Sequence, residues 1–187
     1  LIFRYTENSW VRGVTVEHCA DNATDIRGSY RCTVQECAYV NPLGPVTPSY
    51  RYSFVLDWLS SHILFQRCYA ENGRHEFVTH SRMPGPNAFI DSMSPNGYTT
   101  SGGHHRFAMG TLYDSIKIDS EFASEHRGGS GSGHSWAAAQ NIFWNTESET
   151  IVNDTPVGYM AYAIGVKGTK VLSGYINNNN AGVHEGY

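Results

Sequence analysis

Histidine stands beside arginine or tryptophan at three places in the sequence: HSR at residues 80–82, HHR at 104–106 and HSW at 134–136. An imidazole can take up or release a proton near neutral pH, so it can serve as a general acid or base. The planar fork of arginine fits a carboxylate or sulfate group, and an aromatic face fits a sugar ring. These residue types therefore suit a ligand that carries negative charge and sugar rings, if the fold brings the three segments together.

Short apolar runs, each followed by a small residue, form the framework that must position these segments. With the small residues as landmarks, the runs recur about 18 to 31 residues apart, at Cys19, Cys37, Cys68, Ser92, Ser115 and Asn145. The residue three positions before every landmark is apolar, and these residues are Val16, Val34, Phe65, Phe89, Leu112 and Ile142. A variable period of short strands predicts an all-β fold, a right-handed single-stranded parallel β-helix, with these apolar side chains in one inward column.

An antiparallel β-sandwich is the alternative fold, and it favours tight Asn-Gly hairpins between its strands. Only PNGY at residues 95–98 and ENGR at 71–74 have that form, and both fall between the repeats. We therefore favour the solenoid. In it, Cys19, Cys37 and Cys68 are expected to form a column of buried small side chains, although a Cys19–Cys37 disulfide is also within geometric reach.

The histidines and arginines keep a nearly constant distance from the landmarks. His80, His104 and His134 stand 11 or 12 residues before theirs, and Arg82 and His105 stand 10 residues before. Stacked coils would place these positions in one stripe, made of His80, Arg82, His104, His105, Arg106, His134 and Trp136, with Arg27 and Trp58 in earlier coils.

Strand geometry predicts how the HHR segment is oriented. Neighbouring residues of a strand face opposite sides, so we expect His104 and Arg106 on the open face and His105 held beneath it by a hydrogen bond. The preceding glycines, Gly102 and Gly103, permit the alternative of an irregular backbone.

Composition excludes two classes of function. The 187 residues carry a net charge of −4, whereas a general nucleic-acid binder needs a basic surface. No uninterrupted apolar run approaches the length of a membrane span. We expect a single β-helix domain over residues 1–187 that is an excerpt of a longer protein.

Two stretches of the chain resemble a known superfamily. The segments GPNAFIDSMSPNGYTTSGGHHRFAMGTLYDSIKI and HRGGSGSGHSWAAAQNIFWNTES are similar to secreted right-handed β-helix proteins of the pectate-lyase-like superfamily. At the level of fold the resemblance covers most of residues 10–165, and the motif match is tighter from about Gly85 to Asn145. The resemblance implies a secreted protein, extracellular or periplasmic, that processes glycans, often as a lyase of uronic-acid polymers. It assigns no catalytic residue.

A uronate lyase breaks its chain by β-elimination, which needs a base, a group that neutralises the carboxylate and a proton donor. We expect His105 or His104 to be the base. Arg82 and Arg106 are the expected carboxylate clamps, and the expected proton donor is Tyr113 or His134. The remaining residues of the stripe are expected to bind an acidic polysaccharide: His80, Trp136, Arg27 and Trp58.

Two other functions remain open on the sequence alone. A glycoside hydrolase needs a pair of carboxyl groups, and Asp91 and Asp114 each stand one residue before a landmark. A non-catalytic glycan-binding or adhesion solenoid would use the same stripe for binding only. We expect no cofactor, because arginines oppose a histidine-bound metal, although calcium at Asp91, Asp114 and Asp119 is an alternative.

The glycine-rich segment HRGGSGSGHSW, residues 126–136, admits two interpretations. A mobile linker is one of them. We expect instead an ordered rim of the site, with glycines at positive φ and backbone amides that point toward Arg82 and Arg106.

Overall fold

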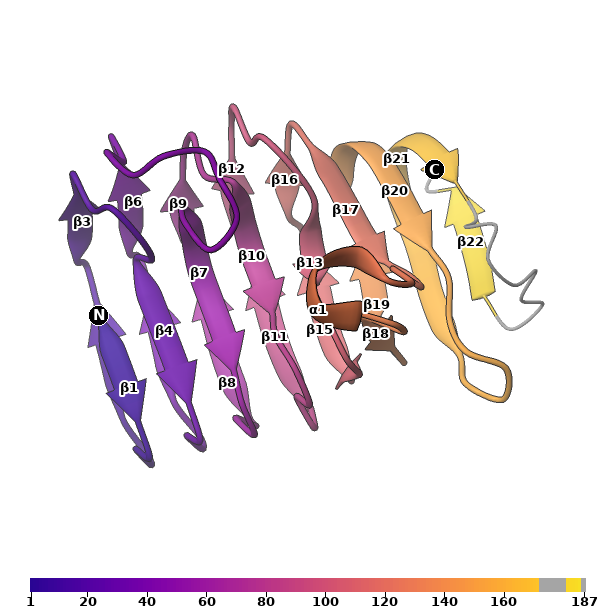
Figure 1. Cartoon of the computed structure of the whole chain (residues 1–187), viewed down its shortest axis with the longest axis horizontal. Coiled ribbons are helices and arrows are strands. Elements are labelled where there is room, and N and C mark those ends of the chain that lie inside the picture. Colours follow the sequence, from indigo (N-terminus) through magenta and orange to yellow (C-terminus); the bar gives the residue numbers. More distant parts are fainter. Residues whose placement is uncertain (172–180, 186–187) are drawn as a thin grey trace.

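The structure is a computed structural model that describes residues 1–171 and 181–185. Its strands wind into successive coils, and each face of a coil lies beside the same face of the next coil (Figure 1). The strands named here pair in parallel, for example β4 with β7 and β11 with β15. The chain is therefore a parallel β-helix, and the prediction of this fold from the sequence is confirmed.

Each coil contributes a strand to three faces, which we call the first, second and third faces. The first face contains β1 (Ile2–Arg4), β4 (Thr24–Arg27), β7 (Tyr52–Asp57), β10 (His75–Thr79), β13 (Ser101–Gly103), β17 (Glu121–Ser124) and β20 (Glu147–Asn153). The second face contains β2 (Trp10–Arg12), β5 (Thr33–Gln35), β8 (Ile63–Gln66), β11 (Asn87–Ile90), β15 (Thr111–Asp114), β19 (Ile142–Trp144), β21 (Ala161–Val171) and β22 (Ala181–Glu185). The third face contains β3 (Thr15–Glu17), β6 (Ala38–Val40), β9 (Tyr69–Ala70), β12 (Met93–Ser94) and β16 (Lys117–Ile118). The long strands β20 and β21 continue around the corners: β20 begins on the third face opposite β16, and β21 runs from the second face over the third to the first.

Two small elements lie outside these faces. β14 (Ala108–Met109) and β18 (Ala138–Ala139) form a separate two-stranded parallel sheet, and α1 (Ser130–Gly133) is a single helical turn. Within residues 1–171 and 181–185, no helix combines the length and the apolar character needed to cross a bilayer.

The core contains a stack of side chains that point inward from the second face. Phe65 stacks on Phe89 with ring centroids 4.6 Å apart, and Tyr113 follows at 5.3 Å from Phe89. The register extends this row in both directions, and its members are Val11, Val34, Phe65, Phe89, Tyr113, Phe143 and Ala163. The predicted inward positions of Val34, Phe65 and Phe89 are thus confirmed.

The other three members of the predicted column lie elsewhere. Val16 belongs to the third face, where it lies opposite Tyr39. Leu112 and Ile142 lie opposite each other one position before the inward row, and both are half-buried. Because side chains alternate along a strand, an error of one residue moves a side chain to the opposite face.

The sharp corner after each second-face strand explains this error. A residue with positive φ turns the chain there, and these residues are Gly13, Glu36, Arg67, Asp91, Ser115, Asn145 and Gly165. Ser115 and Asn145 are therefore corner residues, whereas the other landmarks Cys37, Cys68 and Ser92 come one residue after the corner. Counting from Ser115 and Asn145 as if they were equivalent to Ser92 shifts the last two coils by one position.

The same register corrects two expectations about side-chain pairs. Asp114 lies opposite Ile90 rather than Asp91, so the two carboxylates required by the hydrolase alternative do not stack. Cys37 and Cys68 share a row, but Cys19 does not, because Val14 occupies that position in the first coil. The four cysteines are free, so there is no Cys19–Cys37 disulfide.

A buried acid inside the coils gives a testable prediction. Glu76 is fully buried, where it accepts hydrogen bonds from Ser53 Oγ at 2.5 Å and from the Gly73 amide at 3.0 Å, and burial raises its pKa. An acid with a raised folded pKa contributes stability that is present below its unfolded pKa of about 4.3 and is lost as pH rises through the folded value. Glu76→Gln should therefore raise the unfolding temperature at pH 7 and not at pH 4.

Thermal unfolding at the two pH values measures this effect. The matched control is Glu149→Gln on the exposed surface, which should change the unfolding temperature little at either pH. A Glu76→Gln protein that is less stable than the wild type at pH 7 would show that the buried carboxyl group is ionised.

Candidate functional site

Ionisable side chains form a row where the first-face strands end. Asp57 lies opposite Arg27, and the amide of His104 bonds the carbonyl of Thr79, which places His104 beside His80. Extended by the register of β13, β17 and β20, this ionisable row contains Arg27, Asp57, His80, His104, Glu125 and Asp154. The sequence predicted Arg27, His80 and His104 in one stripe, and the structure brings them into it.

The position predicted for Trp58 belongs to Asp57. Trp58 is the next residue and is exposed. Glu125 and Asp154 were also missed. Asp57 is the last residue of β7, Glu125 directly follows β17 and Asp154 directly follows β20. Positions counted from the ends of the first-face strands, instead of from the landmarks, would have indicated all three acids.

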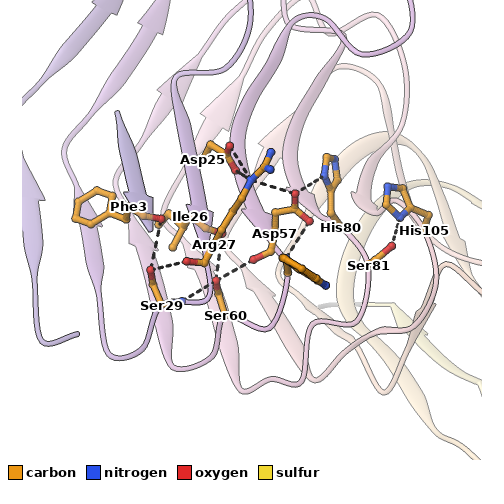
Figure 2. Close-up of polar contacts among 11 residues, drawn as sticks. Phe3, Asp25, Ile26, Arg27, Ser29, Asp57, Ser60, His80, Ser81 and His105 are labelled. Atoms are coloured by element: carbon orange, nitrogen blue, oxygen red, sulfur yellow. Dashed lines mark hydrogen bonds and ion pairs between the residues drawn. The ribbon is translucent and has the colours of Figure 1, made fainter. Parts of the chain in front are cut away.

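An ion-pair chain connects the first coils of the ionisable row (Figure 2). Arg27 Nε lies 2.9 Å from Asp25 Oδ2 and 3.4 Å from Asp57 Oδ2, and the same Asp57 oxygen lies 3.6 Å from His80 Nδ1. Burial raises the pKa of Asp57, but the neighbouring His80 and Arg27 outweigh burial and lower it. Arg27 is thus engaged by two carboxylates, and Asp57 is a carboxylate that fixes one nitrogen of His80.

A cluster of histidines surrounds His104 in three adjacent coils. Its rings are close: His75 lies 4.4 Å and His134 5.2 Å from His104, and His105 lies 4.9 Å from both His80 and His134. We call these five side chains the histidine cluster: His75, His80, His104, His105 and His134. The sequence predicted four of them, and His75 was missed because it stands at the start of β10, away from the HSR motif.

The backbone of the HHR segment is irregular, as the alternative expectation allowed. β13 ends at Gly103, Gly102 has φ +103°, and Arg106 and Phe107 both have positive φ. A Cβ on Gly102 would lie 2.3 Å from the carbonyl oxygen of Ala123, so the close approach of the next coil requires glycine.

This irregular backbone reverses the expected orientation of the two histidines. His104, expected on the open face, is buried with 8% of its surface exposed. His105 is half-buried, and a hydrogen bond between its Nδ1 and Ser81 Oγ at 2.5 Å holds it, as expected (Figure 2).

Most of the histidine cluster is neutral at neutral pH. Burial lowers the pKa of His75 to about 3 and that of His105 to about 4, and it also lowers the pKa values of His104 and His134. Neighbouring arginines and histidines add to the effect, because like charges disfavour protonation. A neutral imidazole has one nitrogen that accepts and one that donates, so the hydrogen bonds of each ring decide its role.

Two residues that the sequence analysis missed contact His104. Arg127 Nη1 lies 2.9 Å from His104 Nδ1 and 2.7 Å from the His104 carbonyl oxygen. On the other side, His104 Nε2 lies 3.3 Å from Tyr52 Oη, which also accepts a hydrogen bond from Arg74 Nη1 at 3.3 Å. No motif indicated Tyr52 or Arg127, because one lies in an apolar run and the other in the glycine-rich segment.

The two predicted clamp arginines have different environments. The Arg82 amide bonds the Arg106 carbonyl at 2.9 Å, so the two residues lie in adjacent coils, but this register places Arg82 opposite Phe107 and not opposite Arg106 as predicted. The Arg106 guanidinium instead donates to the backbone carbonyls of Ser132 and Gly133 and to Ser132 Oγ. Carbonyl groups rather than amides of the glycine-rich segment thus point at Arg106, which contradicts the predicted anion site. Arg82 is exposed.

Tyr113 lies in the core and not in the site. It is fully buried between Phe89 and Phe143, and burial raises its pKa. A hydroxyl group enclosed in this way cannot reach a ligand outside the coils, so the role of proton donor predicted for Tyr113 is wrong.

The glycine-rich segment folds back on itself as a hairpin beside the histidine cluster. His126 forms an antiparallel bridge with Trp136, and the Arg127 and Ser135 backbones are hydrogen-bonded at 2.7 Å. Trp136 is half-buried at the base of this hairpin, with its ring edge-on to His126. Positive φ is confirmed at Gly128, Gly131 and Gly133, whereas Gly129 has ordinary backbone geometry.

Gly131 gives a local test of how this hairpin holds His134. A Cβ at Gly131 would lie 2.3 Å from His134 Cε1, and its φ of +57° is unfavourable for alanine. Gly131→Ala should therefore displace the His134 ring and shift its NMR signals. The matched control is Gly129→Ala, where a Cβ meets open space and φ is ordinary. Equal shifts of the His134 signals in both variants would contradict the contact.

Metal binding receives no support from these side chains. Among the residues that the structure describes, no group of three or more His, Cys, Asp and Glu side chains is placed to hold an ion, and this includes the calcium alternative at Asp91, Asp114 and Asp119.

Comparisons with protein-family models, with the curated proteins and with the solved structures found no match to this chain. The fold and the histidine cluster thus define the class: a parallel β-helix with a buried polar site on its first face.

Proposed function

We propose that this chain is a secreted, carbohydrate-active β-helix protein that resembles the pectate-lyase-like superfamily and cleaves an acidic polysaccharide by β-elimination. The observation that carries the proposal is the histidine cluster on one face of the solenoid, with Arg74 and Arg127 beside it. A neutral imidazole can remove the proton next to a uronate carboxylate, and arginines neutralise the charge that develops there.

The hydrogen bonds limit which histidine can act as the base. Both ring nitrogens of His104 are engaged, by Arg127 and by Tyr52, so His104 does not suit this role. In the described part of the chain, His80 keeps a buried Nε2 without a hydrogen-bond partner, while Asp57 lies beside its Nδ1. His105 is half-buried, and Ser81 holds its Nδ1. The base is therefore sought between these two.

The test is incubation of the purified chain with polymers of galacturonate, of mannuronate and guluronate, and of glucuronate. β-Elimination produces both a new double bond, seen by ultraviolet absorbance, and new reducing ends. Reducing ends without the double bond would indicate a hydrolase, and binding without either product would indicate a non-catalytic solenoid; both results contradict the proposal.

Variants test whether the activity depends on the histidine cluster. His105→Ala should abolish most of the activity or impair binding, because the side chain is half-exposed within the cluster. The control is His18→Ala on the third face, whose exposed side chain lies outside the cluster. Equal activity in the two variants would place the reaction elsewhere on the chain.

A further inference from the structure

We infer that Tyr52 and His80 form the acid–base pair of this site, with Tyr52 as proton donor and His80 as base. This inference rests on the proposed function. It follows from the direction of the hydrogen bonds in the histidine cluster, because the Arg127 side chain can only donate and the Asp57 carboxylate can only accept.

Arg127 fixes the proton of His104. An arginine side chain has donors and no acceptor, so His104 Nδ1, at 2.9 Å from Arg127 Nη1, must accept. The single proton of neutral His104 is then on Nε2, which donates to Tyr52 Oη at 3.3 Å. Arg74 donates to the same oxygen at 3.3 Å. Tyr52 Oη thus accepts two hydrogen bonds, and its own proton is directed away from both donors.

Asp57 fixes the proton of His80 in the opposite way. A carboxylate only accepts, so neutral His80 carries its proton on Nδ1, 3.6 Å from Asp57 Oδ2 (Figure 2). This leaves a lone pair on Nε2, which is buried and has no hydrogen-bond partner. A buried acceptor without a hydrogen-bond partner destabilises the protein. A polar ligand group that reaches this acceptor removes the penalty, which favours binding.

The two groups are adjacent. The Tyr52 and His80 rings meet edge to face, with centroids 5.3 Å apart and an interplanar angle of 90°. One side chain offers a proton and the other a lone pair, and the two rings are in direct contact. Tyr52 begins β7 and His80 follows β10, so adjacent coils hold both side chains in fixed positions.

The proposed reaction balances its protons within this pair. His80 Nε2 takes the proton from the carbon next to the carboxylate, a carbon–carbon double bond forms and the glycosidic carbon–oxygen bond breaks. Tyr52 gives its proton to the leaving oxygen. The resulting imidazolium lies beside Asp57, and the resulting phenolate accepts from His104 and Arg74. Transfer of the proton from His80 to Tyr52 then restores both groups without any co-reactant.

The first test reads the tautomers directly from nitrogen-15 NMR of the histidine rings in the ligand-free protein. We expect the proton of His80 on Nδ1 and that of His104 on Nε2. Arg127→Gln should release the His104 tautomer, and Asp57→Asn should release that of His80. His75 is the internal control, because the Thr100 carbonyl accepts from its Nδ1 independently of both substitutions. A His80 proton on Nε2 in the wild type overturns the assignment.

The second test uses kinetics on the polymer that the wild type cleaves. Tyr52→Phe and His80→Gln should each lower kcat by about 10²- to 10⁴-fold with KM little changed, the range for loss of a general acid or base. The matched control is Tyr98→Phe, an exposed tyrosine outside the cluster. If the wild type cleaves no uronate polymer, the proposed function itself fails. If it does and Tyr52→Phe keeps its kcat, only the acid–base assignment is overturned.

Discussion

Replacement of Phe65 by alanine is expected to lower the free energy of unfolding by about 3–5 kcal/mol, the usual cost of removing a buried aromatic side chain. Phe65 is fully buried, stacks on Phe89 at 4.6 Å and packs edge to face against Phe54 at 5.8 Å. Neighbouring coils are held in place by such stacks, so the cavity cannot be filled by a small shift of one strand. Chemical denaturation measures the effect.

The matched control is Leu112→Ala on β15, two strands further along the same face. Leu112 points away from the core and is half-buried, although the sequence predicted it in the same inward column as Phe65. Its replacement should cost much less than that of Phe65. Equal losses in the two variants would contradict the register of the coils.

Acidification is expected to have the second large effect on stability. The folded pKa values of His75 and His105 are about 3 and about 4, below the unfolded value of about 6.5. Between the folded and the unfolded pKa values, the unfolded chain binds protons that the folded chain does not. The stability that the neutral forms of these two histidines contribute is therefore complete above pH 6.5 and is lost as pH falls toward 4 and then 3. The unfolding temperature should therefore fall steeply between pH 6.5 and 4.

Variants identify the histidines as the cause. His75→Phe keeps an aromatic ring against Tyr52, on which His75 stacks at 4.8 Å, and removes one titrating group. The unfolding temperature of this variant should depend less on pH, whatever its value at pH 7. The control is His18→Gln on the exposed surface. A wild-type protein whose unfolding temperature is flat from pH 6.5 to 4 would contradict the burial of the cluster.

The fold could be predicted because the apolar positions of a solenoid recur once per coil. Val34, Phe65 and Phe89 were placed correctly, since Cys37, Cys68 and Ser92 occupy equivalent positions. Ser115 and Asn145 were misleading, because a small residue suits both the corner and the position after it. Small side chains therefore indicate where each coil lies in the sequence, but not which residue of the coil turns the corner.

The candidate site could be predicted only in part. His80, His104, His105 and His134 were found because they lie in similar motifs at similar distances from the landmarks. Tyr52 and Asp57 were not, since they come from an earlier coil whose contribution depends on which strands pair. The roles of Arg106 and Tyr113 were wrong because side-chain direction depends on corners and positive φ angles that residue spacing does not specify.

The central claim is that the histidine cluster of the first face is where an acidic glycan is bound and cleaved. The most direct test is a crystal structure of the His80→Gln protein with a uronate oligosaccharide. We expect one uronate ring above residue 80, with its carboxylate toward Arg82 or Arg127 and its glycosidic oxygen within hydrogen-bond distance of Tyr52 Oη. An oligosaccharide that binds instead on the second face, for example against the exposed ring of Trp144, would contradict the claim.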